Sequence, residues 1–252
     1  MNEDARRQAP LRPDSRLAAR FASEAERRTV TRALFDQAAS GYDRAEGLTA
    51  LGRGSWYRRD VLRRHGLRTG MSLLDVAAGT GLVTVAGHQL VGPTGHVIAL
   101  DPSPGMLAEL RKKVAVDTIE AYAESIPLPD EQVDFVSMGY ALRHVGDLNR
   151  AFPEYLRVLR PGGRVCIMEI SRPRSRLARA LLRFHIGALV PLLARLMRGR
   201  AEVKPLWKYY GDTIEAAIEP ERILEALRRA GFAEVSGSVT FGIFREYTGR
   251  KA

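Results

Sequence analysis

The sequence predicts a doubly wound α/β fold, in which helices cover both faces of a mostly parallel sheet. Short apolar runs alternate with helix-like stretches through the middle of the chain, and a glycine-rich turn follows the first run. Strands that alternate with helices pair in parallel, because each crossover returns the chain to the same end of the sheet. The expected strands lie at 72–77, 96–101, 117–123, 133–139 and 164–170, and the expected helices at 81–91, 104–114 and 147–159.

Before this alternation the chain has a different character. Residues 1–27 mix Arg, Pro, Ala and Glu without sustained periodicity, so we expect a mobile arm that enters a helix. Helical spacing then recurs from about Thr29 to His65, with interruptions expected at Gly41 and at 52–54.

After residue 170 the pattern becomes helical, then strand-like again. A basic, apolar helical insertion is followed by a helix and by two strand-like runs that flank Gly242 and could form an antiparallel hairpin. These elements are expected at about 175–215, 220–230, 233–240 and 243–249. The simplest organisation is one domain over 28–252 that carries the insertion.

Composition places the chain among ordinary globular proteins. Of its 252 residues 45% are hydrophobic and 27% charged. The single cysteine, Cys166, excludes an internal disulfide and favours a reducing compartment. No apolar run reaches the roughly 18 residues needed to span a bilayer, and the N-terminus has no apolar signal-peptide core. We therefore expect a cytoplasmic protein.

The formal net charge of +10 admits a nucleic acid, an anionic membrane or an acidic substrate as a partner. Net charge alone does not choose among these partners. The position of the basic residues along the chain decides more.

A glycine-rich turn links the first strand to the first helix of the alternation. Residues 73–81 read LLDVAAGTG, in which Gly79 and Gly81 permit positive φ angles and close approach of a ligand to the backbone. The helix that follows offers free N–H groups and the positive end of its dipole. The alternative is an ordinary strand–turn–helix connection, in which the glycines are turn residues and bind no ligand.

Asp101 closes the next strand, twenty residues beyond Gly81. An acid at this place can accept both ribose hydroxyls of a nucleoside. A dinucleotide site would have a third glycine or alanine three residues after Gly81, but the residue there is Thr84. The turn and Asp101 together predict a nucleoside ligand without a pyrophosphate, at the carboxyl end of a parallel sheet.

Five motifs resemble those of known enzymes. The segment DVAAGTG resembles the first motif of class I S-adenosylmethionine (SAM)-dependent methyltransferases. Three others resemble, more narrowly, the ubiquinone/menaquinone-biosynthesis C-methyltransferases of the UbiE type: FDQAASGYD at 35–43, GYALRHV at 139–145 and EISRP at 169–173. The segment LRPGG at 159–163 matches a widespread turn that precedes the fifth strand in such enzymes. The resemblance covers about Phe35 to Ala252.

The resemblance implies a Rossmann-like, seven-stranded sheet with a C-terminal antiparallel hairpin. It also implies SAM as cofactor, S-adenosylhomocysteine as product, and no metal. The implied cofactor residues are Asp75, Ala77, Gly79, Thr80, Gly81, Asp101, Pro102, Tyr122, Ala123 and Gly139. Two depart from the family pattern: Tyr122 replaces Asp or Asn at the adenine, and Gly139 replaces a serine.

Arg143 and His144 follow the fourth strand, where the methyl acceptor should lie. A quinol ring carbon becomes nucleophilic when a phenolic proton is lost, which requires a base and a stabilising positive charge. We hypothesise that His144, with an unperturbed pKa of roughly 6.5, removes the proton and that Arg143 stabilises the oxyanion. Arg143 could instead pair with Asp147 or Glu169, and His144 could bond a backbone carbonyl.

The same family usually has asparagine where this chain has His144, so an unusual phenol is an alternative acceptor. Tyr42 and Asp43 are expected in an N-terminal lid over the cofactor. For Tyr42, a place in the core beside a helix end is the alternative.

The segment 172–200 contains eight arginines and no acidic residue. Arg172, Arg176, Arg179 and Arg183 fall at helical spacing, with abundant leucine beside them. A basic amphipathic helix suits peripheral contact with an anionic membrane, and so suits an enzyme whose aromatic acceptor carries a prenyl tail. A helix that covers the sheet, or a homodimer interface, explains the same pattern.

Competing functions share the predicted fold. The residues GYAL at 139–142 differ from the N/D-P-P-Y/F motif of amino-methylating nucleic-acid enzymes, and Cys166 lies in an apolar strand. We therefore expect no nucleic-acid partner. An O- or C-methyltransferase of a soluble secondary metabolite is the main alternative, and a SAM-binding regulator without turnover is another.

Overall fold

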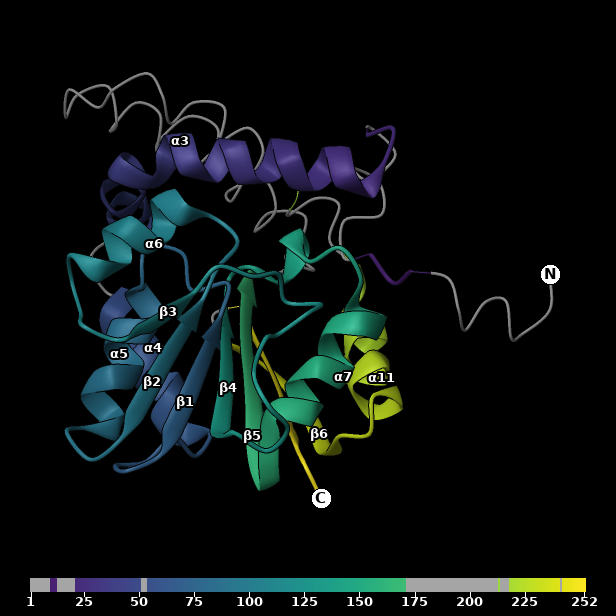
Figure 1. The fold of residues 1–252 in the computed structure, drawn as a ribbon. Helices are drawn as coiled ribbons and strands as arrows, with labels where there is room; N and C mark the ends of the chain where they lie inside the picture. The colour runs from purple at the N-terminus through teal and green to yellow at the C-terminus, as the bar shows by residue number, and fades with distance from the viewer. Residues whose placement is uncertain (1–9, 13–20, 51–53, 171–212, 214–217, 241) are drawn as a thin grey trace.

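Seven strands form one sheet at the centre of the computed structural model, which describes residues 10–12, 21–50, 54–170, 213, 218–240 and 242–252. The strand order is β3-β2-β1-β4-β5-β7-β6 (Figure 1). The strands are β1 (Ser72–Val76), β2 (His96–Leu100), β3 (Asp117–Ile119), β4 (Val133–Gly139), β5 (Leu159–Ile170), β6 (Ala233–Thr240) and β7 (Phe244–Arg250). The first five pair in parallel, and β7 pairs antiparallel with both β5 and β6. The predicted fold class and terminal hairpin are confirmed.

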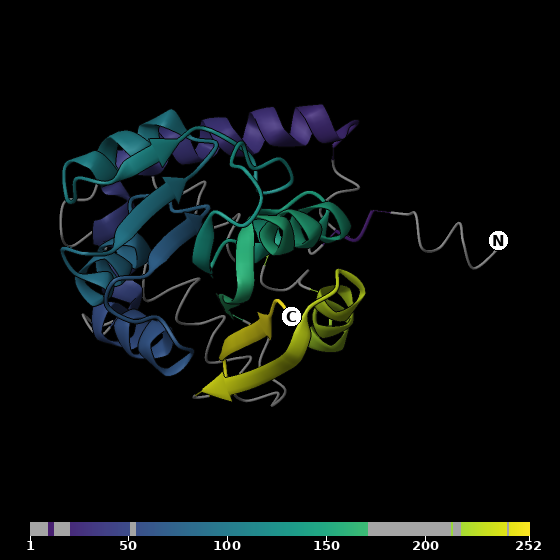
Figure 2. The same ribbon diagram turned by 60° about the horizontal axis from the view of Figure 1, so that its bottom comes forward.

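Helices cover both faces of the sheet (Figures 1 and 2). On one face, α4 (Gly54–Arg64) and α5 (Leu82–Val91) bury Leu62 and Val83 against Leu73 and Phe135. On the other face lie α7 (Leu148–Val158) and α11 (Pro220–Arg229). The apolar positions of α7 and α11 recur at helical spacing, so each presents one stripe to the sheet. The sheet thus carries apolar side chains on both faces, as parallel sheets do.

Side-chain caps fix where two of these helices begin. Ser103 accepts the N–H of Met106 at 3.0 Å, directly before α6 (Pro104–Arg111). Asp147 accepts the N–H of Asn149 at 3.0 Å, directly before α7. Each cap satisfies a backbone donor that has no partner inside its helix. The helices therefore begin at, or one residue beyond, the predicted positions.

Two strands differ in length from the prediction. The third expected strand, 117–123, pairs only over 117–119, because the chain then turns away from β2. The fifth begins earlier than expected, since Leu159 pairs with Val133 and the pairing register shifts between Val133 and Phe135. The Pro-Gly-Gly turn is thus an irregularity inside β5. It is held by the N–H of Gly162, which donates to the Lys251 carbonyl at 3.0 Å.

The helix α3 (Glu24–Ala50) lies across the edge of the sheet at which the parallel strands end (Figure 1). It runs through Gly41, so the interruption expected there is wrong. A glycine inside a helix costs only about 1 kcal/mol relative to alanine. Contacts made by Asp36 and Asp43, on either side of Gly41, compensate for that cost.

Several predictions fall on residues outside the described part of the chain. These are most of the arm at 1–27, the interruption at 52–53, and the helical insertion at about 175–215 apart from Thr213. Within the described residues, no helix is both long enough and apolar enough to cross a membrane.

Candidate active site at the carboxyl edge of the sheet

The glycine-rich turn leaves β1 with three residues in the left-handed region. Ala77, Gly79 and Gly81 have φ angles of 53°, 56° and 88°. A Cβ on Gly81 would lie 2.7 Å from Cγ of Leu110, so this glycine lets α6 pack against the turn. A Cβ on Gly79 would meet nothing within 4 Å. Gly79 is therefore the place where the backbone of the turn faces open space.

Asp101 ties this turn to the end of β2. Its carboxylate accepts the N–H of Gly79 at 2.8 Å through one oxygen and the N–H of Ser103 at 2.8 Å through the other. Burial raises the pKa of Asp101 to about 6, although these two N–H groups lower it. A carboxylate has about four acceptor sites, so two further hydrogen bonds from a ligand's hydroxyl groups are compatible with this geometry. Pro102, the next residue, is half-buried.

Asp75 is fully buried at the base of the same turn. It accepts hydroxyl hydrogen bonds from Thr84 at 2.6 Å and from Ser137 at 2.7 Å, which join β1 to α5 and β4. Burial raises the pKa of Asp75 to about 6 against the lowering effect of the two hydroxyls. Its side chain serves the frame of the turn.

Two aspartates of α3 contact loops at this edge of the sheet: Asp43 contacts the glycine-rich turn, and Asp36 contacts the loop between β2 and α6. Asp43 accepts the Thr80 hydroxyl at 2.5 Å and pairs with Lys113, whose ammonium also donates to the Thr80 carbonyl at 2.6 Å. Asp36 accepts the Ser103 hydroxyl at 2.5 Å and the N–H of Gly105 at 3.0 Å. Asp43 thus lies against the glycine-rich turn, while the lid over the cofactor stays a prediction.

Tyr122 and Ala123 follow β3 at the same edge. The guanidinium of Arg28, from α3, lies 4.5 Å from the centre of the Tyr122 ring. Such a cation–π contact fixes the ring plane. Tyr122 is half-buried and Ala123 is buried.

Gly139 ends β4, and the structure gives a physical reason for glycine there. An added Cβ would overlap a methyl group of Val83, on α5. Tyr140 then turns the chain with φ of 61° and donates its N–H to the Met168 carbonyl at 2.7 Å. The buried guanidinium of Arg58 lies 5.3 Å from the Tyr140 ring centre.

Arg143 and His144 lie in the short 3-10 turn η1 (Leu142–His144) that follows β4. The buried guanidinium of Arg143 pairs with buried Glu169 of β5, which also accepts the Arg143 N–H at 3.2 Å. Of the two acids considered for Arg143, Glu169 is therefore the partner.

The His144 ring packs edge-on against Phe35 of α3, with ring centres 5.2 Å apart. Burial lowers the pKa of His144 well below its usual range, and the positive charges of Arg143 and Arg27 lower it further. The expectation of an unperturbed pKa is therefore wrong. At neutral pH the imidazole is uncharged and can accept a proton.

Comparison with known proteins decides the family. The profile of the ubiE/COQ5 methyltransferase family matches residues 22–251. The chain belongs to that family.

Individual relatives of the ubiE/COQ5 family agree with this assignment. A "Ubiquinone/menaquinone biosynthesis C-methyltransferase UbiE" from Hahella chejuensis is 31% identical, over 87% of this chain and 90% of the relative. A "Demethylmenaquinone methyltransferase" from Clavibacter sepedonicus is 34% identical, over 87% and 89%. The crystal structure of a SAM-dependent methyltransferase from Aquifex aeolicus has the same fold, with a TM-score of 0.60 at 21% identity over 83% and 98%.

This ubiE/COQ5 family member is a SAM-dependent methyltransferase. The residues at the carboxyl edge fit that cofactor, because Gly79 faces open space and buried Asp101 still has acceptor capacity beside it. Within the described residues, no group of three or more His, Cys, Asp or Glu side chains could hold a metal ion.

The structure brings the predicted residues of the glycine turn, β2, β4 and η1 to one edge of the sheet. Sequence reasoning missed four residues that organise this edge: Arg27, Asp36, Lys113 and Glu124. The spacing of Glu24 and Arg27 is a visible signal, but it is also typical of a solvent-exposed helical ion pair. Their long-range partners have no signature in a single sequence.

Proposed function

We propose that this enzyme transfers the SAM methyl group to a ring carbon of a quinol- or phenol-type acceptor resembling demethylmenaquinol or demethoxyubiquinol. The family match over residues 22–251 carries the proposal. Two relatives, a ubiquinone/menaquinone C-methyltransferase and a demethylmenaquinone methyltransferase, support the acceptor class.

The cofactor residues divide by the groups they would bind. Asp101 would accept the ribose hydroxyls, and the backbone at Ala77, Gly79, Thr80 and Gly81 would line the methionine part of SAM. Tyr122 would lie against the adenine, since its ring is already fixed by Arg28, and Ala123, Pro102 and Gly139 would contribute surface. Asp75 would act through the frame that it forms with Thr84 and Ser137.

When bound, SAM supplies an electrophilic methyl group whose bonding electron pair leaves with the sulfur. The acceptor must present a carbon nucleophile in line with that bond. Proton removal from the phenolic hydroxyl raises the electron density of the ring carbon, and a later proton loss from that carbon restores aromaticity. We assign the first proton transfer to His144, which is uncharged at neutral pH because its pKa is low.

Arg143 is assigned to the developing phenolate. Its buried guanidinium pairs with Glu169 of β5, which keeps a positive charge at the edge of the sheet where the acceptor should lie. The pairing also fixes the plane of the guanidinium, so that a contact with the oxyanion would need little reorganisation.

The deciding experiment incubates the purified enzyme with methyl-labelled SAM and a short-tailed demethylmenaquinol under reducing conditions. We expect label on the ring carbon, read by mass spectrometry and carbon NMR, and stoichiometric S-adenosylhomocysteine. A parallel reaction contains soluble polyphenols. Label only on the soluble phenols would replace the proposal with the alternative of a soluble-metabolite methyltransferase. Label only on a phenolic oxygen of the quinol would replace transfer to carbon with transfer to oxygen.

A His144→Asn variant tests the base. Loss of a general base lowers turnover by about 10²- to 10⁴-fold. Because a base must be deprotonated, wild-type kcat/KM should fall as pH drops through the lowered pKa of His144, below about 6.5, and the variant should lack that acid limb. Unchanged turnover across pH 5–9 in the variant would remove the role.

A further inference from the structure

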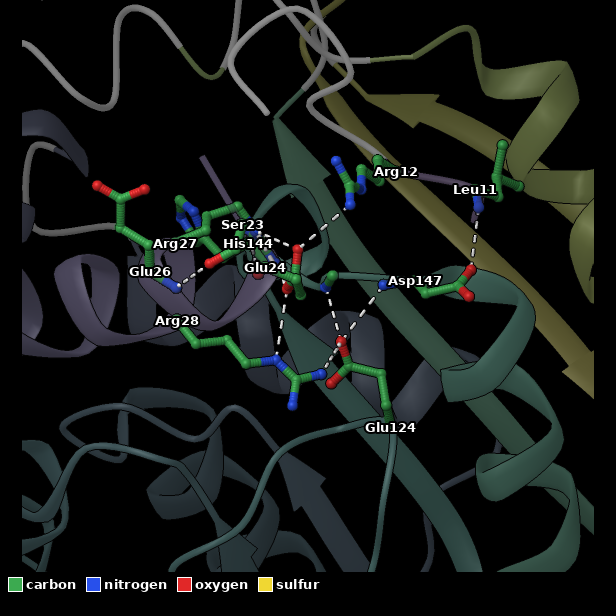
Figure 3. A network of polar contacts seen from close by, with 11 residues as sticks. Leu11, Arg12, Ser23, Glu24, Glu26, Arg27, Arg28, Glu124, His144 and Asp147 are labelled. Atoms are coloured by element: carbon green, nitrogen blue, oxygen red, sulfur yellow. Dashed lines mark hydrogen bonds and ion pairs between the residues drawn. The ribbon is translucent and has the colours of Figure 1, made fainter. Parts of the chain in front are cut away.

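The first turn of α3 contacts the turn that carries His144, and the residues involved are drawn in Figure 3. Arg27, which is 3% exposed, donates from Nη1 to the backbone carbonyl of His144 at 3.1 Å. The same guanidinium also donates to the Glu24 carboxylate, from Nε at 3.0 Å and from Nη2 at 2.8 Å. One buried arginine thus joins an acid on its own helix to the backbone of the catalytic turn.

Glu124, in the loop after β3, binds the backbone that follows His144. Its Oε1 accepts the N–H of Gly146 at 2.7 Å and the N–H of Asp147 at 3.3 Å. The Arg28 guanidinium lies 3.3 Å from the same oxygen (Figure 3). The backbone from the His144 carbonyl to Asp147 is therefore fixed by side chains of two different elements.

Gly146 is what allows the two acids and Arg27 to converge. A Cβ on Gly146 would lie 2.8 Å from Oε1 of Glu124 and 2.9 Å from Nη2 of Arg27, and it would overlap a Glu24 oxygen. Any side chain there would push the charged groups apart. The glycine thus marks a site built for close approach of charged groups to the turn.

We propose that Arg27, oriented by Glu24, is a positioning residue for methyl transfer: it fixes the His144 carbonyl so that the imidazole meets the acceptor in a reactive geometry. This inference rests on the proposed function, because it takes His144 as the base. It assigns a role in chemistry to the N-terminal helix that is separate from its contacts with the cofactor turn.

The charged groups around His144 support a second readout. They are Arg27 and Glu24 on α3, Arg143 in its own turn with Glu169 on β5, and Glu124 after β3. The positive charge of Arg27 lowers the pKa of His144. Removal of that charge raises this pKa. Looser packing would raise it too, because burial is the larger cause, so the charge-conserving variant Arg27→Lys separates the two effects.

The experiment compares wild type with Arg27→Gln and Arg27→Lys. For Arg27→Gln we expect kcat to fall by about 10- to 100-fold, since a small misplacement of a catalytic group has effects of this size. The acid limb of kcat/KM should move to higher pH. Arg27→Lys should recover part of the lost kcat and part of the shift in the acid limb, because lysine keeps the positive charge and an N–H donor. Affinity for S-adenosylhomocysteine should stay within about twofold.

Histidine NMR gives a readout that needs neither cofactor nor acceptor. The His144 resonance, identified by its loss in His144→Asn, should titrate at higher pH in Arg27→Gln than in wild type. If wild type methylates no quinol, the proposed function fails, while the NMR shift still tests the link between Arg27 and His144. If Arg27→Gln does not fold, Glu24→Gln is the substitute: kcat should again fall, but the His144 pKa should move lower, because Arg27 keeps its positive charge and loses its compensating carboxylate.

Arg157→Gln is the matched control. Arg157 forms the same three-residue-spaced, two-point pair with Glu154 and also donates to backbone carbonyls, but it lies at the end of α7. The Arg157→Gln variant should be less stable than wild type, with the acid limb of kcat/KM and the pH at which the His144 resonance titrates both unchanged. Equal kcat loss in both variants with an unmoved His144 titration, or an Arg27→Gln enzyme with wild-type kcat and pH profile, would overturn the proposal.

Discussion

Asp75 and Asp101 end adjacent parallel strands, and both are buried carboxylates whose pKa is raised to about 6. Burial is the main cause in each case, since it penalises the charged form. A folded-state pKa above the unfolded value means that the folded protein binds more protons between the two values. Stability therefore falls as pH rises from about 3.8 to about 6.

We predict that Asp75→Asn gains stability relative to wild type as pH rises. The amide stays neutral, and the hydroxyls of Thr84 and Ser137 can reorient toward it. The difference should grow from pH 4 to pH 7 by at most about 3 kcal/mol. Urea unfolding at several pH values measures it. Asp117→Asn, at an exposed site, is the control, and parallel curves for Asp75→Asn and wild type would contradict the assignment.

Gly139 illustrates a residue whose role the sequence left open. The resemblance shows only that Gly139 replaces the usual serine, whereas the structure places a Val83 methyl group where a Cβ would stand. We predict that Gly139→Ser destabilises the fold by about 1–3 kcal/mol through overpacking. The double variant Gly139→Ser/Val83→Ala should recover most of the loss in a denaturant titration. Equal stability of the single variant and wild type would show that the contact relaxes freely.

The partner of Arg143 shows where single-residue prediction ends. The sequence leaves both Asp147 and Glu169 as candidates. The choice depends on the register of β4 against β5, which sets Gly139 opposite Met168 and so brings Glu169 beside the turn after β4. A register of this kind is a long-range property, and helix or strand periodicity does not contain it.

At the scale of elements, periodicity located most of the sheet well. The apolar runs at β1, β2, β4 and β6 match the observed strands to within one residue. Propensity misjudged Gly41, where contacts outside the helix outweigh a local cost. The Pro-Gly-Gly segment, which the motif resemblance gives as a turn before β5, is included in the backbone pairing with β4 and Lys251.

The place of α3 over the carboxyl edge of the sheet is the feature of this fold that sequence periodicity shows least. Its contacts span long separations, such as the 67 residues between Asp36 and Ser103. The family motif FDQAASGYD contains both Asp36 and Asp43. Only the three-dimensional arrangement shows that Asp43 contacts the glycine-rich turn and that Asp36 contacts the loop after β2. The helix thus joins the cofactor loops to η1.

We predict that Asp43→Ala weakens the binding of S-adenosylhomocysteine by about tenfold, the size expected for loss of a charged hydrogen bond. The Thr80 hydroxyl and the Lys113 ammonium both lose their common partner. Isothermal titration calorimetry measures the affinity. Glu109→Gln, which breaks an exposed pair with Lys112 on α6, should bind as wild type does. If Asp43→Ala and Glu109→Gln bind alike, α3 does not support the cofactor turn.

At the scale of the whole molecule, the net charge of +10 is unevenly distributed along the chain. The segment 172–200, outside the described residues, contributes eight arginines without an acid. The proposed acceptor, if it carries a prenyl tail, resides in lipid, so a surface that binds anionic headgroups would bring the enzyme to its substrate. Each basic residue near such a surface adds about 1 kcal/mol.

We predict that the enzyme co-sediments with vesicles containing anionic phosphatidylglycerol at low salt and is released at high salt, as screening requires. The triple variant Arg176→Glu/Arg179→Glu/Arg183→Glu should bind at least about 100-fold more weakly, since three favourable contacts are lost. The control, Arg59→Glu/Arg63→Glu/Arg68→Glu, carries the same net charge but changes exposed positions on and after α4. If the control loses binding as strongly, overall charge is responsible and the segment has no special role. If neither variant differs from wild type, the basic segment serves the fold or a homodimer, and the acceptor must reach the enzyme by another route.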